Sequence, residues 1–430
     1  MNRTPLSAVS LLALALTGQT ALAQRQAPSV REIGPSASPQ PSVRRAGAPS
    51  DATPRGRAMA AGQRPVVLLT GYWPPTNEML RRFSPKPSLN PQGWIGSDWH
   101  GRGYDVMAFF PEFPNPNCGT CGTGFGDLTV DYQDTVPDFA RISELLRPIA
   151  VITFSRGFPG TSWEVEMNQF NRSSWIDDYV VPRQPDTLPP DGSLPAGALR
   201  LSSLPANRII DAVEAANVGV DPRICWAGDG GGFLSEFVAY LGVWYQARNA
   251  DPLSPDWCVS AGHVHVGGAV SWTQGAAAAE VTLETVLDHV DEVLACPPVI
   301  QYCEGLTNSL GAGADLSVVG APSISGNEMR LHVQRLPLSA ATLTFYGPDR
   351  GMGTIGDGLL CVGGSLTRLV AINANSRGAR RILLDLTAPT LGSGTTAVTV
   401  GSTWRFQTWY RDSIGAGSNT TNAIEITFCP

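Results

Sequence analysis

Apolar runs alternate with amphipathic segments from Arg64 to about residue 295. The runs are typical of buried strands, since both faces carry apolar side chains; they cover 65–73, 104–113, 148–157, 223–228 and 258–268. Three segments have the apolar spacing of helices instead: 204–218, 233–249 and 281–295. Strands that alternate with helices predict an α/β domain.

The pattern changes after Cys296 to short alternating strands separated by Gly, Asp, Pro and Ser. The expected strands lie within 328–336, 341–347, 380–387, 396–412 and 423–428. Such a series is typical of an antiparallel sandwich or small barrel. We therefore place a domain boundary near 295 and expect an accessory β-sandwich domain over 296–430.

The first 64 residues follow neither pattern. Residues 1–23 combine an early arginine, a short apolar run and the small-residue ending Ala21-Leu22-Ala23, which predicts a secretory signal peptide. The run is too short to span a bilayer. Residues 24–64 are rich in Pro, Ser, Ala and Arg and lack periodicity, so we expect a disordered linker. The mature chain is expected to be soluble and secreted or periplasmic.

Charge and cysteine content narrow the class of protein. The net charge of −7 argues against a nucleic-acid partner. An even number of cysteines, eight, favours disulfides in an exported chain without fixing their connectivity. In sequence they form neighbouring pairs: Cys118 and Cys121, Cys225 and Cys258, Cys296 and Cys303, Cys361 and Cys429. The first pair could be half of a zinc or redox motif, but nothing nearby completes one, so a loop-closing disulfide is favoured.

The stretch "DGGGFLSEFVAY", 229–240, places three glycines before an amphipathic helix with Ser235 in its first turn. Glycines allow close approach of a substrate, and a helix N-terminus offers N–H groups and a positive dipole end. Ser235 could therefore attack an acyl carbon while neighbouring N–H groups hold the oxyanion. The alternative is that Ser235 only begins a helix, since this is not the G-x-S-x-G elbow.

A base and an orienting carboxylate for Ser235 are available elsewhere. His263 and His265 alternate at the end of a predicted strand and so share one face. A metal pair is conceivable there, but the stretch offers no third ligand. His289 lies among acidic residues on a helix and is expected to be solvated. Glu164 and Glu166 follow a strand and a glycine-containing loop; one could orient the histidine, or both could lie on the surface.

In order, the segments from about 65 to 295 resemble the motifs of the pyroglutamyl peptidases (pyrrolidone-carboxylate peptidases), cysteine exopeptidases that remove an N-terminal pyroglutamate. "VLLTGYWPP" resembles their first strand and T-G-F-x-P-F turn, and "EVEMNQFN" their E-x-x-A-x-N segment. "LSSLPANRIIDAVEAANV" resembles their S-T-L-P helix, "GGGFLSEFVAY" their A-G-x-x-x-C-N turn, and "GHVHVGG" their F-x-H-V-P. The resemblance implies a three-layer α/β/α sandwich with a mixed sheet.

The resemblance also implies catalytic roles: Glu166 as the triad carboxylate, Ser235 at the nucleophile position and His265 as the base. The family has cysteine where this chain has Ser235. A serine must be deprotonated during attack by a well-aligned base, whereas a thiolate forms readily beside a histidine. The replacement therefore marks either a retuned serine hydrolase or a domain that no longer catalyses.

The implied substrate-binding residues depart from the family as well. Tyr72 and Pro75 stand for the aromatics that sandwich the pyrrolidone ring, with Trp73 between them in place of an acidic residue. The family's G-Q-A turn is replaced by Ser155-Arg156-Gly157. Arg156 could meet a carboxylate-bearing substrate or be a surface charge. The expected set is completed by the turn residues Gly231, Gly232 and Leu234. The insertion 182–198 lies where the family shapes its substrate entrance.

The C-terminal part, from "GDGLLCVGGSLTRL" through "FQTWYRDS", resembles β modules appended to exported bacterial proteins. Trp404, Trp409 and Tyr410 could form a platform for carbohydrate or another surface. Packing in a core explains alternating aromatics as well or better.

Two functions follow from the sequence. The first is an exported hydrolase of amide or ester bonds with a Ser-His-Glu triad, acting on a peptide or small acyl substrate, without metal or organic cofactor. The alternative is a catalytically inactive binding or adhesion protein that keeps the scaffold.

Overall fold

The computed structural model describes residues 64–430 apart from 119–120, 229, 388–390 and 392–396. The expected signal peptide, and the expected linker apart from Arg64, lie outside the described residues. None of the helices in the described part of the chain has both the length and the apolar composition needed to cross a membrane.

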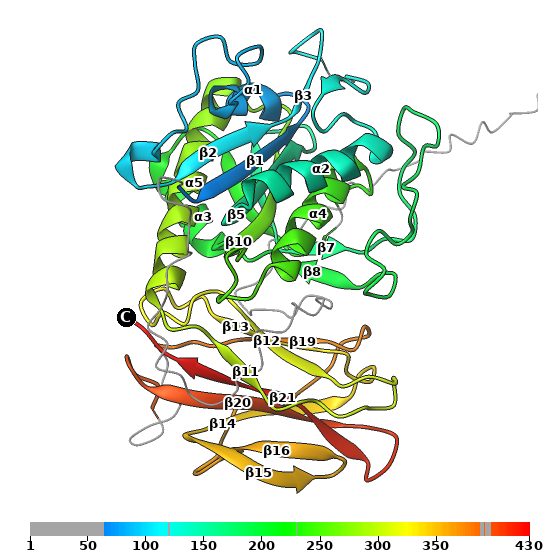
Figure 1. Ribbon diagram of the computed structural model, residues 1–430, viewed down its shortest axis with the longest axis vertical. Coiled ribbons are helices and arrows are strands. Elements are labelled where there is room, and N and C mark those ends of the chain that lie inside the picture. Colours follow the sequence, from blue (N-terminus) through cyan, green and yellow to red (C-terminus); the bar gives the residue numbers. More distant parts are fainter. Residues whose placement is uncertain (1–63, 119–120, 229, 388–390, 392–396) are drawn as a thin grey trace, which may run out of the picture. The chain divides into compact units, whose positions relative to one another are not determined.

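A six-stranded mixed sheet organises the α/β part (Figure 1), with strand order β2-β1-β5-β10-β6-β9. Its strands are β1 Val66–Tyr72, β2 Asp105–Phe109, β5 Ala150–Arg156, β6 Ser162–Glu166, β9 Asp221–Cys225 and β10 Ser260–Val266. The β10–β6 pair is antiparallel, and every other neighbouring pair is parallel. The carboxyl ends of β1, β5 and β10 therefore share one edge.

Helices cover both faces of this sheet. On β1, Val67 and Leu69 join one core and Leu68 joins the other, because successive side chains of a strand point to opposite faces. The first core also contains residues of α1 Thr76–Leu80, α3 Ala206–Ala216 and α5 Trp272–Ala295. The second contains residues of α2 Tyr132–Leu146 and α4 Leu234–Arg248. The predicted three-layer α/β/α arrangement is confirmed.

Two helices show what the periodicity captures and what it misses. α3 lies within the predicted segment 204–218 and buries Ala206, Ile209 and Val213 at helical spacing. α5 begins at Trp272 rather than at 281, because its alanine-rich first turns carry no large apolar stripe. Its start is marked by a capping box between Ser271 and Gln274.

Short elements complete the α/β part. They are the 3-10 helices Arg81–Phe83 and Trp99–Gly101, the pair β3 Pro111–Glu112 and β4 Phe125–Gly126, and the pair β7 Asn168–Phe170 and β8 Leu199–Leu201.

The remaining described strands pair antiparallel, as predicted for an all-β region. One sheet has the order β11-β21-β20-β14-β17, with β18 also on β14; β12-β13-β19 form a second, and β15-β16 a hairpin. The strands are β11 Ile300–Tyr302, β12 Asp315–Val319, β13 Arg330–Gln334, β14 Ala341–Gly347, β15 Asp349–Ile355, β16 Gly358–Gly363, β17 Thr367–Arg368, β18 Ile372–Asn373, β19 Arg380–Leu383, β20 Thr403–Arg411 and β21 Ser418–Thr427.

The aromatic residues of β20 are mostly interior. Trp404 and Tyr410 are 5% and 0% exposed and belong to the core of this region, while Trp409 is partly buried. Core packing therefore accounts for Trp404 and Tyr410, which cannot serve as an exposed platform. Contacts do not divide the described residues into separate units, so the boundary near 295 stays a prediction.

Three disulfides are present: Cys118–Cys121, Cys296–Cys429 and Cys303–Cys361. Only the first joins neighbours in sequence; Cys225 and Cys258 are buried and form no disulfide. Pairing in sequence order fails because β11 pairs with β21, which brings the end of the chain beside the residues that follow α5. Disulfides of this kind indicate an oxidising environment.

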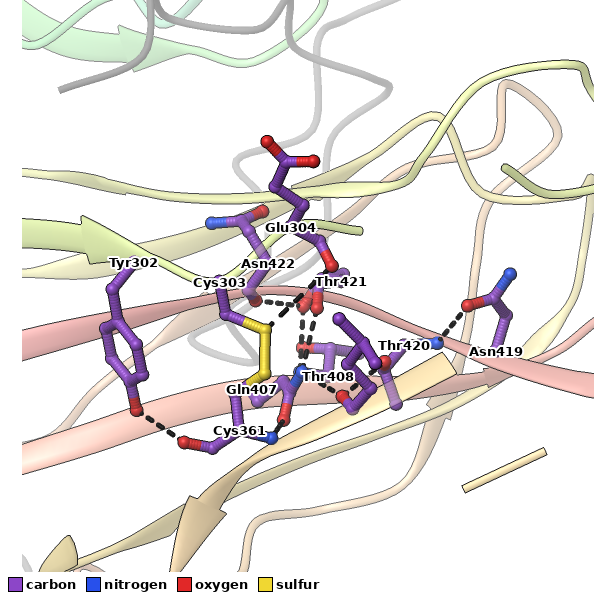
Figure 2. Close-up of a disulfide and its surroundings, with 11 residues drawn as sticks. Tyr302, Cys303, Glu304, Cys361, Gln407, Thr408, Asn419, Thr420, Thr421 and Asn422 are labelled. Carbon is purple, nitrogen blue, oxygen red and sulfur yellow. Dashed lines mark hydrogen bonds between the residues drawn. A yellow bond between two sulfur atoms is a disulfide. The ribbon is translucent and has the colours of Figure 1, made fainter. Parts of the chain in front are cut away.

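The Cys303–Cys361 bond closes over a hydrogen-bonded polar cluster (Figure 2). Gln407 accepts from the backbone N–H of Cys361 and donates to the carbonyl groups of Leu359 and Thr421. The Gln407 side chain is fully buried, and these three bonds satisfy it. Side-chain bonds thus join β16 to the strands β20 and β21.

We expect the double substitution Cys303→Ala/Cys361→Ala to lower the free energy of unfolding by about 4 kcal/mol, because this bond closes a loop with a sequence separation of 58. The matched control is Cys118→Ala/Cys121→Ala, whose separation of 3 predicts a smaller loss of about 2 kcal/mol. Urea unfolding under non-reducing conditions measures both. Equal losses would contradict the loop-length argument.

Candidate functional site

A buried histidine–carboxylate pair lies where β10 and β6 run antiparallel. His265 Nδ1 is 2.5 Å from Glu166 Oε1, and both residues are almost fully buried. In the strand register His263 is opposite Glu166 and His265 opposite Glu164, so the pair is formed diagonally across the two strands. The structure thus brings together Glu166 and His265, the two residues that the sequence analysis expects as carboxylate and base.

The two groups shift each other's pKa. Burial alone would raise the pKa of Glu166, but the charge of His265 and the hydrogen bond to it outweigh burial and lower the pKa to about 2. Burial alone would lower the pKa of His265, but Glu166 outweighs it and holds the pKa above the ordinary value of 6.5. With Nδ1 engaged by Glu166, the proton-accepting atom left on His265 is Nε2.

His263 has a different environment beneath the pair. Its Nδ1 is 2.8 Å from the hydroxyl of Thr153 and its Nε2 is 2.9 Å from that of Ser155. Burial lowers the pKa of His263 to about 3, so this ring is neutral at neutral pH. The His263 and His265 rings meet edge to face, with centroids 4.5 Å apart. His263 thus supports His265 and does not share its charge.

Glu166, His263 and His265 also bring three metal-binding side chains together, with ligand atoms within 4.8 Å of one another. Glu166 supplies the third donor that the H-x-H stretch itself lacks. Both ring nitrogens of His263 are already bound to hydroxyls, however, and Nδ1 of His265 is bound to the carboxylate. The arrangement fits an acid–base pair better than a metal site.

The glycine turn lies directly against this pair. A Cβ atom added to Gly230 would be 2.8 Å from Cε1 of His265 and 3.2 Å from Oε1 of Glu166. Ser235 is in the first turn of α4, partly exposed, and its Oγ is 3.5 Å from the carbonyl oxygen of Gly230. Ser235 and His265 therefore adjoin the same residue, although no hydrogen bond joins them in the part of the chain described.

Glu236, which the sequence analysis did not single out, holds the turn in place. Its Oε2 accepts from the backbone N–H of Gly232 at 2.8 Å, and its Oε1 pairs with Arg172 at 2.7 Å. Arg172 also donates to the carbonyl group of Gly228. Burial raises the pKa of Glu236 despite Arg172. The sequence did offer a signal for the role of Glu236, because a carboxylate at the start of an otherwise apolar helix needs a polar partner.

The predicted substrate-binding residues separate into two groups. Tyr72 and Leu234 are core residues, 3% and 1% exposed, and the Tyr72 hydroxyl bonds to that of Thr135. Pro75 and Arg156 instead line a cavity at the carboxyl edge of the sheet. Neither Tyr72 nor Leu234 presents a side chain to a ligand in this arrangement.

The remaining members of the set lie around the turn. Trp73 packs against Phe233 and Tyr179, with ring centroids 6.0 and 6.4 Å apart. Gly231 and Gly232 have φ of 94° and 68°, values that favour glycine. The N–H of Gly232 is occupied by Glu236, so an oxyanion could be held only by other amides of the turn.

Two expectations about surface positions are wrong. His289 is 2% exposed rather than solvated, and burial lowers its pKa to about 4. The reason is that α5 is covered over a wider arc than its apolar stripe predicts, including Thr282 and Thr285. The surface alternative for Glu164 and Glu166 also fails, because both are buried; Glu164 pairs with Arg223 across β6 and β9.

Comparisons with known proteins find similarity to solved structures only. The chain matches no protein-family model and no curated protein sequence. It is similar to a mutant pyrrolidone carboxyl peptidase from the hyperthermophile Pyrococcus furiosus at 17% identity, covering 52% of this chain and 98% of that one, with a TM-score of 0.38. The enzyme from Thermococcus litoralis gives 17% identity over 53% of this chain and 95% of its own, also with a TM-score of 0.38. Both are peptidases of the family whose motifs the sequence resembles.

We expect Gly230→Ala to destabilise the protein by about 1–3 kcal/mol, since the new methyl group must displace His265 or Glu166. The matched control is Gly192→Ala, where an added Cβ meets nothing within 4 Å and φ is not positive. Urea unfolding measures the free energy, and the ring signals of His265 in an NMR spectrum report its displacement. Wild-type stability with unmoved His265 signals would contradict the close contact.

Proposed function

We propose that the protein is an exported hydrolase of amide or ester bonds that uses Ser235, His265 and Glu166. The observation that carries the proposal is the buried His265–Glu166 pair in contact with the glycine turn that leads to Ser235. A histidine oriented through Nδ1 by a carboxylate, beside a hydroxyl at a helix N-terminus, is the combination that nucleophilic catalysis by serine requires.

Each residue has a defined task in this proposal. Ser235 Oγ attacks the substrate carbonyl carbon while His265 Nε2 takes its proton, and Glu166 stabilises the imidazolium that forms. Backbone N–H groups of the turn other than that of Gly232 hold the oxyanion. His265 then protonates the leaving group, and water attacks the acyl-enzyme with His265 again as base. The Ser235 hydroxyl bonds to the Gly230 carbonyl in the structure, so the proposal requires a change of its χ1 rotamer that turns it toward His265.

The substrate side of the proposal is a peptide or small acyl compound. Of the predicted binding residues, we assign substrate contact to Pro75 and Arg156, which line the cavity, and to Trp73 and Gly231 at the turn. The expected signal peptide and the three disulfides support action outside the cytoplasm.

The second candidate is a catalytically inactive binding protein on the same scaffold. The observation in its favour is that Ser235 bonds to the Gly230 carbonyl rather than to His265. In such a protein the His265–Glu166 pair would only stabilise the fold, and Ser235 would not react with an acylating or phosphonylating reagent.

We expect a fluorophosphonate probe to label the purified protein, and Ser235→Ala to abolish labelling. His265→Ala should slow labelling by about 10³-fold or more, since the serine then lacks its base. The control Ser254→Ala removes a hydroxyl from a loop away from the turn and should label like wild type. Absence of labelling in the wild type, with hydrolysis of a pyroglutamyl amide gained in Ser235→Cys, would establish the inactive alternative.

The labelling rate should rise with pH through the pKa of His265, because only the neutral ring can accept the Ser235 proton. Since Glu166 holds that pKa above 6.5, the Glu166→Gln variant should lower the maximal rate and move the midpoint to lower pH. The control Glu164→Gln removes a charge that acts on His265 without a hydrogen bond, so its midpoint should move less. A profile that is flat between about pH 5 and pH 9 would show that His265 is not the base.

A further inference from the structure

A cavity of about 440 Å³ lies at the carboxyl edge of the central sheet. Its walls come from Pro74 and Pro75 after β1, Arg156 at the end of β5, and Gly268 and Trp272 after β10. The carboxyl ends of parallel strands are where open α/β sheets bind their ligands. The place of this cavity in the fold is therefore that of a ligand site.

The described lining residues carry one charge. Arg156 carries the only ionisable side chain among the described lining residues, and the other polar side chains are those of Asn117 and Ser271. The guanidinium is held against the wall: Nη1 donates to the Cys118 carbonyl at 3.3 Å, and Gly268 packs so closely that an added Cβ would be 3.0 Å from Nε. Such a fixed guanidinium recognises a carboxylate well.

The rest of the lining is apolar. Pro74, Pro75 and Val270 cover part of it, and Trp272 is 41% exposed. One positive charge beside apolar walls fits a single carboxylate on a short carbon chain. A phosphate group, with about two negative charges, would need more cations than the cavity offers.

Arg156 is connected to the proposed catalytic residues through the backbone. It pairs in register with Val266, the residue after His265, and an added Cβ at Gly157 would lie 3.3 Å from Cβ of His265. Because neighbouring residues of a strand face opposite sides, Arg156 and His265 lie on opposite faces where their strands end. A ligand that reaches both must cross the edge of the sheet.

We propose that this cavity binds a carboxylate of the substrate, so that the hydrolase acts on acyl compounds or short peptides that carry a free carboxylate several bonds from the scissile bond. The choice of substrate class rests on the proposed function. The binding of a carboxylate to Arg156 does not depend on catalysis and is tested separately.

The test is isothermal titration of the full chain with N-acetyl-L-alanine, butyrate and the uncharged butyramide. Using the Ser235→Ala background keeps the measurement independent of turnover. We expect both carboxylates to bind and butyramide not to bind. Arg156→Gln should weaken carboxylate binding at least tenfold, and Arg156→Lys should weaken it less, because lysine keeps the charge and loses the two-pronged geometry. The control Arg368→Gln removes an exposed arginine from β17 and should change nothing.

Equal binding of butyramide and butyrate, or unchanged binding in Arg156→Gln, would overturn the proposal, as would no binding of either carboxylate. Inorganic phosphate that binds more tightly than butyrate would also overturn it. Carboxylate binding that requires Arg156, in a protein that no fluorophosphonate labels, would refute the hydrolase and leave this site established.

Discussion

The antiparallel insertion of β6 beside β10 is the constraint on which the candidate site depends. In an all-parallel sheet, the last residues of one strand would lie beside the last residues of its neighbour, where both chains leave the sheet. Here the end of β6 runs back alongside β10, so that Glu166 enters the interior next to His265. Each of the two buried groups shifts the pKa of the other, that of Glu166 downward and that of His265 upward. The pairing of two strands thus determines which histidine contacts the carboxylate.

The surroundings of the pair reduce the number of states it can adopt. Hydroxyls from β5 bind both nitrogens of His263. Burial lowers the pKa of that ring to about 3, so His263 is neutral at neutral pH. On the opposite side Glu236 and Arg172 hold the glycine turn through its backbone. These contacts hold the backbone of the turn at Gly228 and Gly232.

Much of this arrangement could be read from the sequence. Apolar runs located the strands of the central sheet, helical spacing located α3 and α4, and the ordered motifs selected Glu166 over Glu164 and His265 over His263. Contacts between distant segments could not be read in this way. The pairing of β11 with β21 decided the disulfides, and the coverage of α5 decided the burial of His289. Tyr72 aligned with a binding residue, but its hydroxyl bonds to Thr135 in the core, since the strand continues through it. The role of Glu236 depends on the backbone conformation of the glycine turn, which the spacing of residues in the sequence does not predict.

The Cys296–Cys429 bond joins the residue after α5 to the penultimate residue of the chain. The bond therefore closes residues 296–429 into a covalent ring. This ring continues into the α/β part only through the peptide bond before Cys296. A single protease cut within that ring cannot release a fragment while the bond is oxidised. The nicked protein would gain one water molecule in mass and would separate into pieces only when reduced. This region can therefore remain attached to the α/β part after damage that would detach an ordinary C-terminal extension.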